Sequence, residues 1–317
     1  MGLRVKAFIT GITGFAGPHL AAHLLDCGDQ VIGSSLSGAW PADVPPDTRS
    51  RVPLVRWDIA QGLTDEARRQ ISDFAPDALY HLAAISIPDD CGADFPTVEA
   101  FAINVAGTAA ALDLAASLSF PPKVLFTSTG HVYAPVTFEQ PYVNEQYPVA
   151  PHSGYGKSKL IAEQLVSAHV SKKRGEAVIA RVFKHSGARQ VSRLMLPQWA
   201  EQFARRSSEP LRVYSLNSFL DLSDVHDISR AYRQLILAGT NGEIYNVGSG
   251  INRRSGDIFE VMRRFANDSR RVVETKPARR QEQIADIAKI TAATGWRPNI
   301  PVEQTVRDVY EDWRTRV

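Results

Sequence analysis

Tyr155 and Lys159, which lie four residues apart in the segment YGKSK, have the types and spacing of an acid–base pair. Side chains four apart on a helix share one face, so both groups can act on the same atom. An ammonium group beside a phenol favours the phenolate, which predicts that Lys159 lowers the pKa of Tyr155 toward neutral pH. Because many helices carry such a pair by chance, the surrounding sequence has to decide whether it is functional.

A strand that ends in hydroxyl groups precedes this pair. The segment KVLFTST, residues 123–129, is apolar enough for a buried strand. Strand ends in an open α/β sheet face the ligand crevice, so Ser128, Thr129 and His131 are candidate substrate contacts. Thr129 would orient a substrate oxygen while the tyrosine exchanges its proton and the lysine holds the nicotinamide ribose. This arrangement predicts hydride transfer at a carbinol.

A glycine-spaced turn upstream has the form of a dinucleotide-binding loop. The sequence TGITGFAG, residues 10–17, follows a predicted strand and opens a predicted helix. Gly11 permits a tight turn, Gly14 lets the backbone approach a pyrophosphate, and Gly17 lets the helix pack on the strand. The helix N-terminus then offers unpaired N–H groups to the phosphates. This order of elements favours a cofactor site over a purely structural turn.

The end of the second predicted strand distinguishes between two cofactors. An acidic side chain there would bind the ribose 2′-hydroxyl of NAD, whereas this chain has Ser34 and Ser35. NADP(H) is therefore favoured and NAD(H) is the alternative, although the turn contains no arginine. The residues expected to contact the cofactor are Gly11, Thr13, Gly14, Phe15, Ala16, Gly17, Ser34, Ser35, Asp58, Ile59, Leu82, Ala83, Ala84, Ser86, Asn104, Thr127, Tyr155, Lys159, Phe183 and His185.

The elements that must position these residues alternate along the first half of the chain. We expect long helices at 98–118 and 154–174, and strands at 5–10, 30–35, 52–59, 77–84, 123–129 and 177–183. This alternation predicts an α/β fold with a doubly wound parallel sheet, a Rossmann architecture. Residues 1–183 would form the dinucleotide-binding domain, with about 221–250 returning to it. Residues 184–317 would form mainly a smaller C-terminal substrate-binding lobe.

Bulk composition limits the classes of partner. A net charge of +2 and a hydrophobic content of 44% give no argument for binding nucleic acid or a membrane. We identify no apolar run of membrane-spanning length and no signal peptide. Cys27 and Cys91 suit a reducing compartment, and the histidines lack the ligand spacing of a metal site. We expect a soluble cytoplasmic protein without a metal.

With these residues in place, the chain resembles the extended short-chain dehydrogenases/reductases, the NAD-dependent epimerase/dehydratase family that acts on nucleotide sugars. Beyond TGITGFAG and YGKSK, the resemblance includes HLAAIS, NVAGT, RVFKHSGARQ, DLSDVHDISRAY, YNVGSG and DIAKITAATGWRP, in this order. The segments after Phe183 look most like GDP-4-keto-6-deoxy-D-mannose reductases and GDP-mannose 4,6-dehydratases. The resemblance implies that Thr129, Tyr155 and Lys159 are catalytic and that the two long helices form a homodimer.

Several positions depart from the family pattern. Two residues after the catalytic threonine, the dehydratases carry a glutamate that acts at the sugar C5, where this chain has His131. Lys184 replaces an asparagine, Leu220 replaces an arginine, and Lys276 replaces the arginine of a late Arg-Pro pair. A lysine provides a point charge where an arginine would clamp a phosphate through two hydrogen bonds. The expected substrate contacts are Ser86, Ser128, Thr129, His131, Lys184, Arg189, Lys276 and Arg279.

The resulting hypothesis is an NADP(H)-dependent reductase that delivers hydride to the 4-keto group of a 6-deoxy nucleotide sugar, with a GDP-linked substrate favoured. The first alternative is a nucleotide-sugar 4-epimerase or 4,6-dehydratase with tightly bound NAD, which would use the same catalytic residues reversibly. His131 in place of glutamate disfavours 4,6-dehydration, since a reductase needs no base at C5. The second alternative is a non-catalytic dinucleotide-binding scaffold or sensor, which the intact Tyr155/Lys159 pair disfavours.

Overall fold

Seven strands form the central sheet of the computed structural model, which describes residues 3–317. They are β1 (Lys6–Thr10), β2 (Gln30–Ser35), β3 (Leu54–Arg56), β4 (Ala78–His81), β5 (Lys123–Thr129), β7 (Ala177–Val182) and β12 (Ile244–Val247). Their order is β12-β7-β5-β4-β1-β2-β3, and neighbouring strands are parallel. From β1 to β3 each new strand is added toward one edge of the sheet, and from β4 onward toward the other edge, as in a Rossmann sheet. The predicted doubly wound parallel fold is confirmed.

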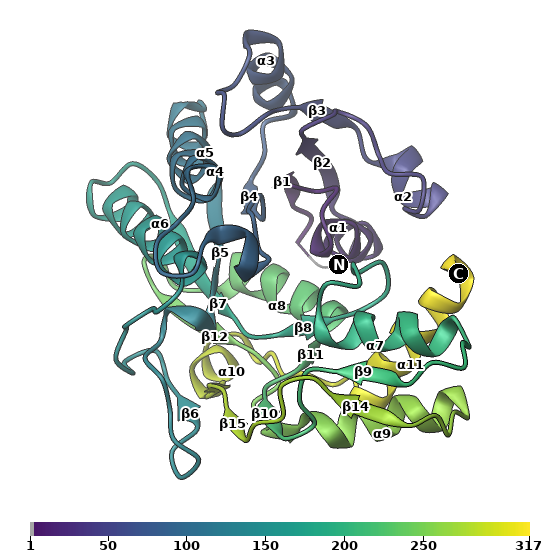
Figure 1. Cartoon of the computed structure of the whole chain (residues 1–317). Coiled ribbons are helices and arrows are strands. Elements are labelled where there is room, and N and C mark those ends of the chain that lie inside the picture. The colour runs from purple at the N-terminus through teal and green to yellow at the C-terminus, as the bar shows by residue number, and fades with distance from the viewer. Residues whose placement is uncertain (1–2) are drawn as a thin grey trace.

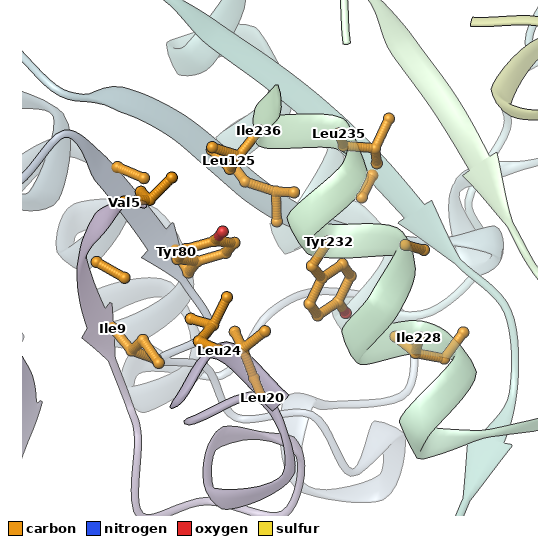
Figure 2. Packing of buried hydrophobic residues seen from close by; sticks show 14 of the residues in the cluster. Val5, Ile9, Leu20, Leu24, Tyr80, Leu125, Ile228, Tyr232, Leu235 and Ile236 are labelled. Carbon is orange, nitrogen blue, oxygen red and sulfur yellow. The ribbon is translucent and has the colours of Figure 1, made fainter. Parts of the chain in front are cut away.

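The strands are apolar throughout because each one is covered on both faces. In β1, Ile9 joins the cluster under α1 (Ala16–Asp26) and α8 (Val225–Ala238), whereas its neighbour Phe8 joins the cluster on the other face. Successive side chains of a strand point to opposite faces, so two buried faces need a continuous apolar run. Figure 2 shows the first cluster, in which side chains of the sheet meet those of α1 and α8.

The second face carries the helices that flank the predicted catalytic segment. They are α3 (Asp65–Phe74), α4 (Val98–Phe101), the π-helical turn η2 (Ala102–Ala106), α5 (Gly107–Ser117) and α6 (Gly154–Ser171). The helix expected at 98–118 is therefore present but interrupted by a π turn. α5 and α6 lie side by side on the sheet, as Figure 1 shows. Two short 3₁₀ helices, η1 (Pro88–Cys91) and η3 (Gly130–Val132), lie near the start of α6.

The remaining elements form a smaller lobe with its own apolar core. Three helices, α7 (Met195–Ala204), α9 (Ser255–Ala266) and α11 (Val302–Arg316), pack on one another and on short strands. These strands are β9 (Leu211–Val213), β10 (Ser218–Leu220), β13 (Arg253–Arg254), β14 (Val272–Glu274) and β15 (Arg280–Gln281). Figure 1 shows the helices of the lobe at the lower right, below α1.

The chain crosses between sheet and lobe more than once. α8 and β12 return to the large sheet, and α10 (Ala288–Thr294) then packs on both of them. Two parallel pairs connect the two parts: β6 (Tyr142–Val143) with β16 (Ile284–Ala285), and β8 (His185–Ser186) with β11 (Ser223–Asp224). The short helix α2 (Pro46–Arg51) lies beside α1. The return of α8 and β12 falls within the segment 221–250 that the sequence assigned to the sheet.

The stretch Val98–Ser117 has the length and apolarity of a membrane-spanning helix, contrary to the expectation that no apolar run is long enough. Half of its most apolar window is buried inside this fold, where it covers the sheet. A core helix passes the same test of length and composition, so the stretch is weak evidence for a membrane.

Candidate active site

The glycine turn joins β1 to α1 with almost no space for side chains. Gly11 has a φ of +66°, and a Cβ on it would lie 2.6 Å from the Ala83 Cα atom. A Cβ on Gly17 would lie 2.1 Å from the Ile12 carbonyl oxygen. α1 therefore begins close to the end of β1, and its first N–H groups face the sheet's carboxyl edge. This geometry suits a helix N-terminus that receives an anion.

A cavity of about 920 Å³ opens from this turn along the carboxyl ends of the strands. Its size is that of a pocket for a cofactor and a substrate. Most of the side chains chosen from the sequence line it: Gly11, Thr13, Gly14, Phe15, Ala16, Gly17, Ser34, Ser35, Asp58, Ile59, Leu82, Ala83, Ala84, Ser86, Thr127, Ser128, Thr129, His131, Tyr155, Lys159, Phe183, Lys184, His185 and Arg189.

Thr129, Tyr155 and Lys159 meet in this cavity from two elements. Thr129 ends β5, and the other two lie in the first turns of α6, which packs against β5. Ser153 caps α6, because its hydroxyl accepts the Gly156 N–H at 3.2 Å. The Thr129 side chain lies near enough to the Tyr155 phenol to favour its ionised form. The three groups thus form one polar constellation at a strand end.

The ionisation of this pair differs from the expectation. Burial raises the pKa of Tyr155 to about 12, and the nearby Thr129 side chain, which lowers it, only partly opposes this. Burial also lowers the pKa of Lys159 to about 8, while the nearby Glu163 carboxylate raises it. The phenol is therefore protonated at neutral pH rather than brought close to ionisation, since desolvation disfavours the charged form. A protonated phenol can donate a proton to a developing alkoxide.

His131 lies directly against the tyrosine. Its ring meets the Tyr155 ring edge-on, with 5.7 Å between the centroids and an interplanar angle of 71°. Burial lowers the pKa of His131 to about 4, with further lowering by Lys184 and His152 and an opposing effect of Glu282. The imidazole is neutral at pH 7, so it can exchange hydrogen bonds with a ligand without carrying charge.

Ser128 was expected to contact substrate, but its hydroxyl is already engaged. The Ser128 Oγ donates to Glu163 Oε1 at 2.5 Å, and the residue is 4% exposed. Glu163 in turn accepts two hydrogen bonds from Arg181. The alternation of side chains along β5 turns Ser128 toward α6 rather than toward the cavity centre. Ser128 therefore contributes to the site mainly by supporting its structure.

Asn104 was expected to contact the cofactor, but it does not line the cavity. It lies in the π turn, where its Oδ1 accepts the Ile85 N–H at 2.8 Å and its Nδ2 donates to the Ile85 carbonyl at 3.0 Å. The same Nδ2 donates to Ser158 Oγ at 3.0 Å. Asn104 thus fixes the loop after β4, which carries Ser86, to the helix that carries Tyr155.

Lys276 and Arg279 were expected to bind substrate, but they too lie outside the cavity lining. The Lys276 ammonium lies 5.0 Å from the Tyr214 ring centre, and the Arg279 guanidinium lies 4.0 Å from the Phe138 ring centre. Lys276 thus lies over a ring of the lobe and Arg279 over a ring in the loop before β6, an arrangement that their sequence position does not reveal.

Lys184 and Arg189 line the cavity, each paired with a carboxylate. Lys184 forms an ion pair with Glu282, and both side chains are partly exposed. Arg189 has its Nε at 3.1 Å from Asp43 Oδ2 and is only 12% exposed. Both cations therefore stand at the wall of the cavity with a counter-charge beside them. An anionic ligand would have to compete with these carboxylates.

The structure adds residues that local motifs do not reveal. Asp43, in the loop after β2, and Tyr232, on α8, line the cavity from distant parts of the sequence. Glu163 lies four residues after Lys159 on α6, so helical spacing alone could have identified it. Within residues 3–317, no group of three or more His, Cys, Asp or Glu side chains is arranged to hold a metal ion.

Comparisons with known proteins agree with this geometry. Residues 8–309 match the family model described as GDP-mannose 4,6 dehydratase. The chain is 27% identical over 320 residues to the GDP-6-deoxy-D-mannose reductase of Pseudomonas aeruginosa, and the match covers 98% of each protein.

Two solved structures share the fold over nearly the whole chain. The structure of RMD from Pseudomonas aeruginosa, complexed with NADPH, matches with a TM-score of 0.82 and 27% identity, and covers 99% of both chains. The UDP-glucose 4-epimerase of Thermus thermophilus, in complex with NAD, matches with a TM-score of 0.85 and 23% identity. That match covers 98% of this chain and 100% of the epimerase, and at this identity it shows the fold alone.

Proposed function

Because the chain belongs to the GDP-mannose 4,6 dehydratase family, we propose that it reduces the 4-keto group of a GDP-linked 6-deoxy sugar with NADPH. The chain is an enzyme of the extended short-chain dehydrogenase/reductase type that acts on nucleotide sugars. The observation that carries the proposal is the meeting of Thr129, Tyr155 and Lys159 at the end of β5, in a cavity that begins at the glycine turn.

The polar groups have defined tasks in this reaction. NADPH, when bound, supplies the hydride that adds to the sugar C4. Thr129 donates a hydrogen bond to the O4 oxygen, and the Tyr155 phenol gives its proton to the same oxygen as the carbonyl becomes an alkoxide. The Lys159 ammonium stabilises the resulting phenolate and would also hold the nicotinamide ribose. The product is the C4 alcohol, and the phenol regains its proton from solvent.

The neutral His131 favours reduction over 4,6-dehydration. A dehydratase must remove the C5 proton, and an imidazole that took this proton would become a buried cation beside Tyr155. The lowered pKa of His131, caused by burial and by Lys184, opposes that charge. A reductase needs His131 only as a neutral neighbour that packs on the tyrosine and hydrogen-bonds to the sugar.

Two features support NADPH as the cofactor. Ser34 and Ser35 end β2 without a carboxylate, and Ser35 Oγ accepts the Gly38 N–H at 3.0 Å, which holds the following turn. A 2′-phosphate would meet hydroxyl groups at the end of β2, where a carboxylate would repel it. The P. aeruginosa relative named RMD was solved with NADPH.

The test is a spectrophotometric assay at 340 nm with GDP-4-keto-6-deoxy-D-mannose and NADPH. We expect stoichiometric oxidation of NADPH by the wild type and a loss of kcat of about 100-fold or more in Tyr155→Phe, because its proton donor is removed. Tyr142→Phe is the matched control, since Tyr142 is 54% exposed on β6 and should leave turnover unchanged. Unchanged turnover in Tyr155→Phe would contradict the mechanism.

The alternatives predict different behaviour in the same preparation. A 4-epimerase or 4,6-dehydratase would be purified with bound NAD and would interconvert sugars without net consumption of NADPH. A scaffold or sensor would bind the dinucleotide and turn over no sugar. Thermal-shift measurements with GDP, UDP and dTDP test the nucleotide: stabilisation by UDP or dTDP alone would overturn the GDP assignment.

A further inference from the structure

A buried ion pair lies next to the proposed catalytic groups. Glu163 on α6 and Arg181 on β7 have side chains that are 5% and 4% exposed. Their contact is bidentate, with Arg181 Nε at 2.9 Å from Glu163 Oε1 and Arg181 Nη2 at 2.7 Å from Oε2. Burying two charges costs several kcal/mol per ion, and an apolar pair of similar volume is often as stable. The position of this ion pair beside the catalytic groups therefore suggests a role beyond stability.

Glu163 occupies the same face of α6 as the catalytic pair. Tyr155, Lys159 and Glu163 follow one another at intervals of four residues, so they form one line along the helix. Glu163 Oε1 also accepts the hydroxyl of Ser128 at 2.5 Å. Ser128 immediately precedes Thr129 at the end of β5, so this hydrogen bond ties the strand end to the helix.

Arg181 holds the carboxylate in a fixed orientation. Its guanidinium donates to both Glu163 oxygens, and its Cζ atom lies 4.8 Å from the Tyr133 ring centre. The Tyr133 hydroxyl donates to Asn246 Oδ1 at 2.6 Å, and Asn246 is part of β12. The Glu163 carboxylate, which accepts the Ser128 hydroxyl, is thus anchored to β7 and, through Tyr133, to β12. A side chain that is held rigidly can position a reacting group more precisely than a side chain on a loop can.

We infer that Glu163 is a positioning residue of the active site, which holds Thr129 against Tyr155 through Ser128 and places its negative charge one helical turn from Lys159. This inference rests on the proposed function, because it assigns the same three catalytic groups. It adds two separable tasks: a hydrogen bond that sets geometry and a charge that sets ionisation.

The surroundings of Lys159 show why a charge is needed. The ammonium lies 4.5 Å from the Phe126 ring centre and is almost excluded from water, and this burial lowers its pKa to about 8. Glu163 raises that pKa, because an anion favours the ammonium form. The titratable and charged groups that face Lys159 come from α6, η1, β4 and β7: Tyr155, Glu163, Cys91, His81 and, behind Glu163, Arg181.

Two substitutions separate the two tasks. Ser128→Ala removes the hydrogen bond and leaves every charge in place, so we expect kcat to fall about tenfold with an unchanged alkaline limb of its pH profile. Glu163→Gln keeps an oxygen that can accept from Ser128 but removes the charge. We expect the alkaline limb to move about one pH unit lower, because the Lys159 pKa falls.

A second readout does not depend on turnover. NADPH affinity, measured by fluorescence titration across pH, should weaken as Lys159 loses its proton, since the ammonium attracts the anionic cofactor. In Glu163→Gln the pH midpoint of this loss of NADPH affinity should move to lower pH, as the alkaline limb of the kcat profile does. If the wild type binds NADPH but reduces no keto sugar, the proposed function fails, and the NADPH titrations still decide this inference.

Controls address folding and general loss of an ion pair. The double variant Glu163→Met/Arg181→Met keeps the volume and leaves no unpaired charge, so it replaces Glu163→Gln if that variant does not fold. Asp29→Asn disrupts another buried pair, in which Arg233 Nε lies 2.7 Å from Asp29 Oδ2, away from the cavity. It should lower the unfolding temperature and leave both pH midpoints unchanged. Wild-type midpoints in the Glu163 variants, or wild-type kcat in Ser128→Ala, would overturn the inference.

Discussion

Lys159 carries a charge in a place that water hardly reaches. The residue is 2% exposed, and burial lowers its pKa to about 8 from an unperturbed 10.5. A lysine whose pKa is lower in the folded protein destabilises the fold wherever it must be protonated. The charge that the proposed reaction uses is therefore maintained at the expense of stability, which is common at functional sites.

This cost gives a prediction for Lys159→Met. The variant should be inactive but unfold at a higher temperature than the wild type at pH 7. Below pH 8 Lys159 is protonated in the folded wild type, which therefore bears the full cost of burying the ammonium. Between pH 8 and 10.5 folding releases a proton, so the stability of the wild type rises with pH. The gap in unfolding free energy should narrow by about 3 kcal/mol between pH 7 and pH 10.5.

Chemical denaturation at several pH values measures this gap. Lys172→Met is the control, because Lys172 is exposed at the end of α6 and its ammonium is solvated in both states. Its difference from the wild type should not depend on pH. A Lys159→Met variant that is less stable than the wild type at pH 7, or a gap that stays constant with pH, would show that burial does not penalise this ammonium.

At the level of elements, the junction of β1 with α1 shows how backbone proximity builds the cofactor site. Gly17 lies in the first turn of α1, where the Ile12 backbone would be 2.1 Å from an added Cβ. The close packing leaves the helix N-terminus at the cavity wall rather than behind a layer of side chains. The glycine spacing is thus a steric requirement of this junction, independent of which dinucleotide binds.

Gly17→Ala should therefore displace α1 and abolish measurable NADPH binding, with a loss of stability of about 3 kcal/mol from overpacking. Gly295→Ala is the matched control: its φ is +70°, but nothing lies within 4 Å of an added Cβ. We expect it to cost about 1 kcal/mol of backbone strain and to leave NADPH affinity intact. Isothermal titration and thermal unfolding measure both effects, and retained affinity in Gly17→Ala would argue against α1 as the phosphate-binding helix.

At the scale of the whole molecule, an apolar surface remains beside the helices that cover the catalytic face. Phe95, just before α4, and Val98 and Phe101, at its two ends, are 76%, 82% and 48% exposed. This segment adjoins the start of α6, where the Lys157 ammonium lies 4.4 Å from the Phe95 ring centre. Exposed apolar side chains that cluster in this way favour a protein interface. A homodimer through these helices remains our proposal.

Val98→Arg tests it, because a charge in the centre of an apolar interface is costly to desolvate. If the protein is a dimer through this surface, light scattering coupled to gel filtration should show the wild type as a dimer and the variant as a monomer. Ile251→Arg, at a half-exposed apolar side chain of the lobe, should leave the mass unchanged. A wild type that elutes as a monomer would remove the proposal.

Local sequence determined much of the sheet and the cofactor turn. β2 and β5 span the residues that their apolar runs predicted, and Gly11 and Gly17 stand where the strand meets the helix. These features follow from short-range rules, since a buried parallel strand must be apolar along its length and a tight turn excludes side chains. The spacing of Tyr155 and Lys159 likewise placed both side chains in one cavity with Thr129.

Tertiary structure alone decided which polar groups face the ligand and which face each other. Ser128 and Asn104 were chosen as ligand contacts, yet Ser128 donates to Glu163 and Asn104 holds the Ile85 backbone. The sequence also predicted a phenol near ionisation, whereas burial keeps Tyr155 protonated. Burial and hydrogen bonding depend on side chains that α6, β5 and β7 bring together from distant positions. Spacing along a single helix or strand contains no information about these partners.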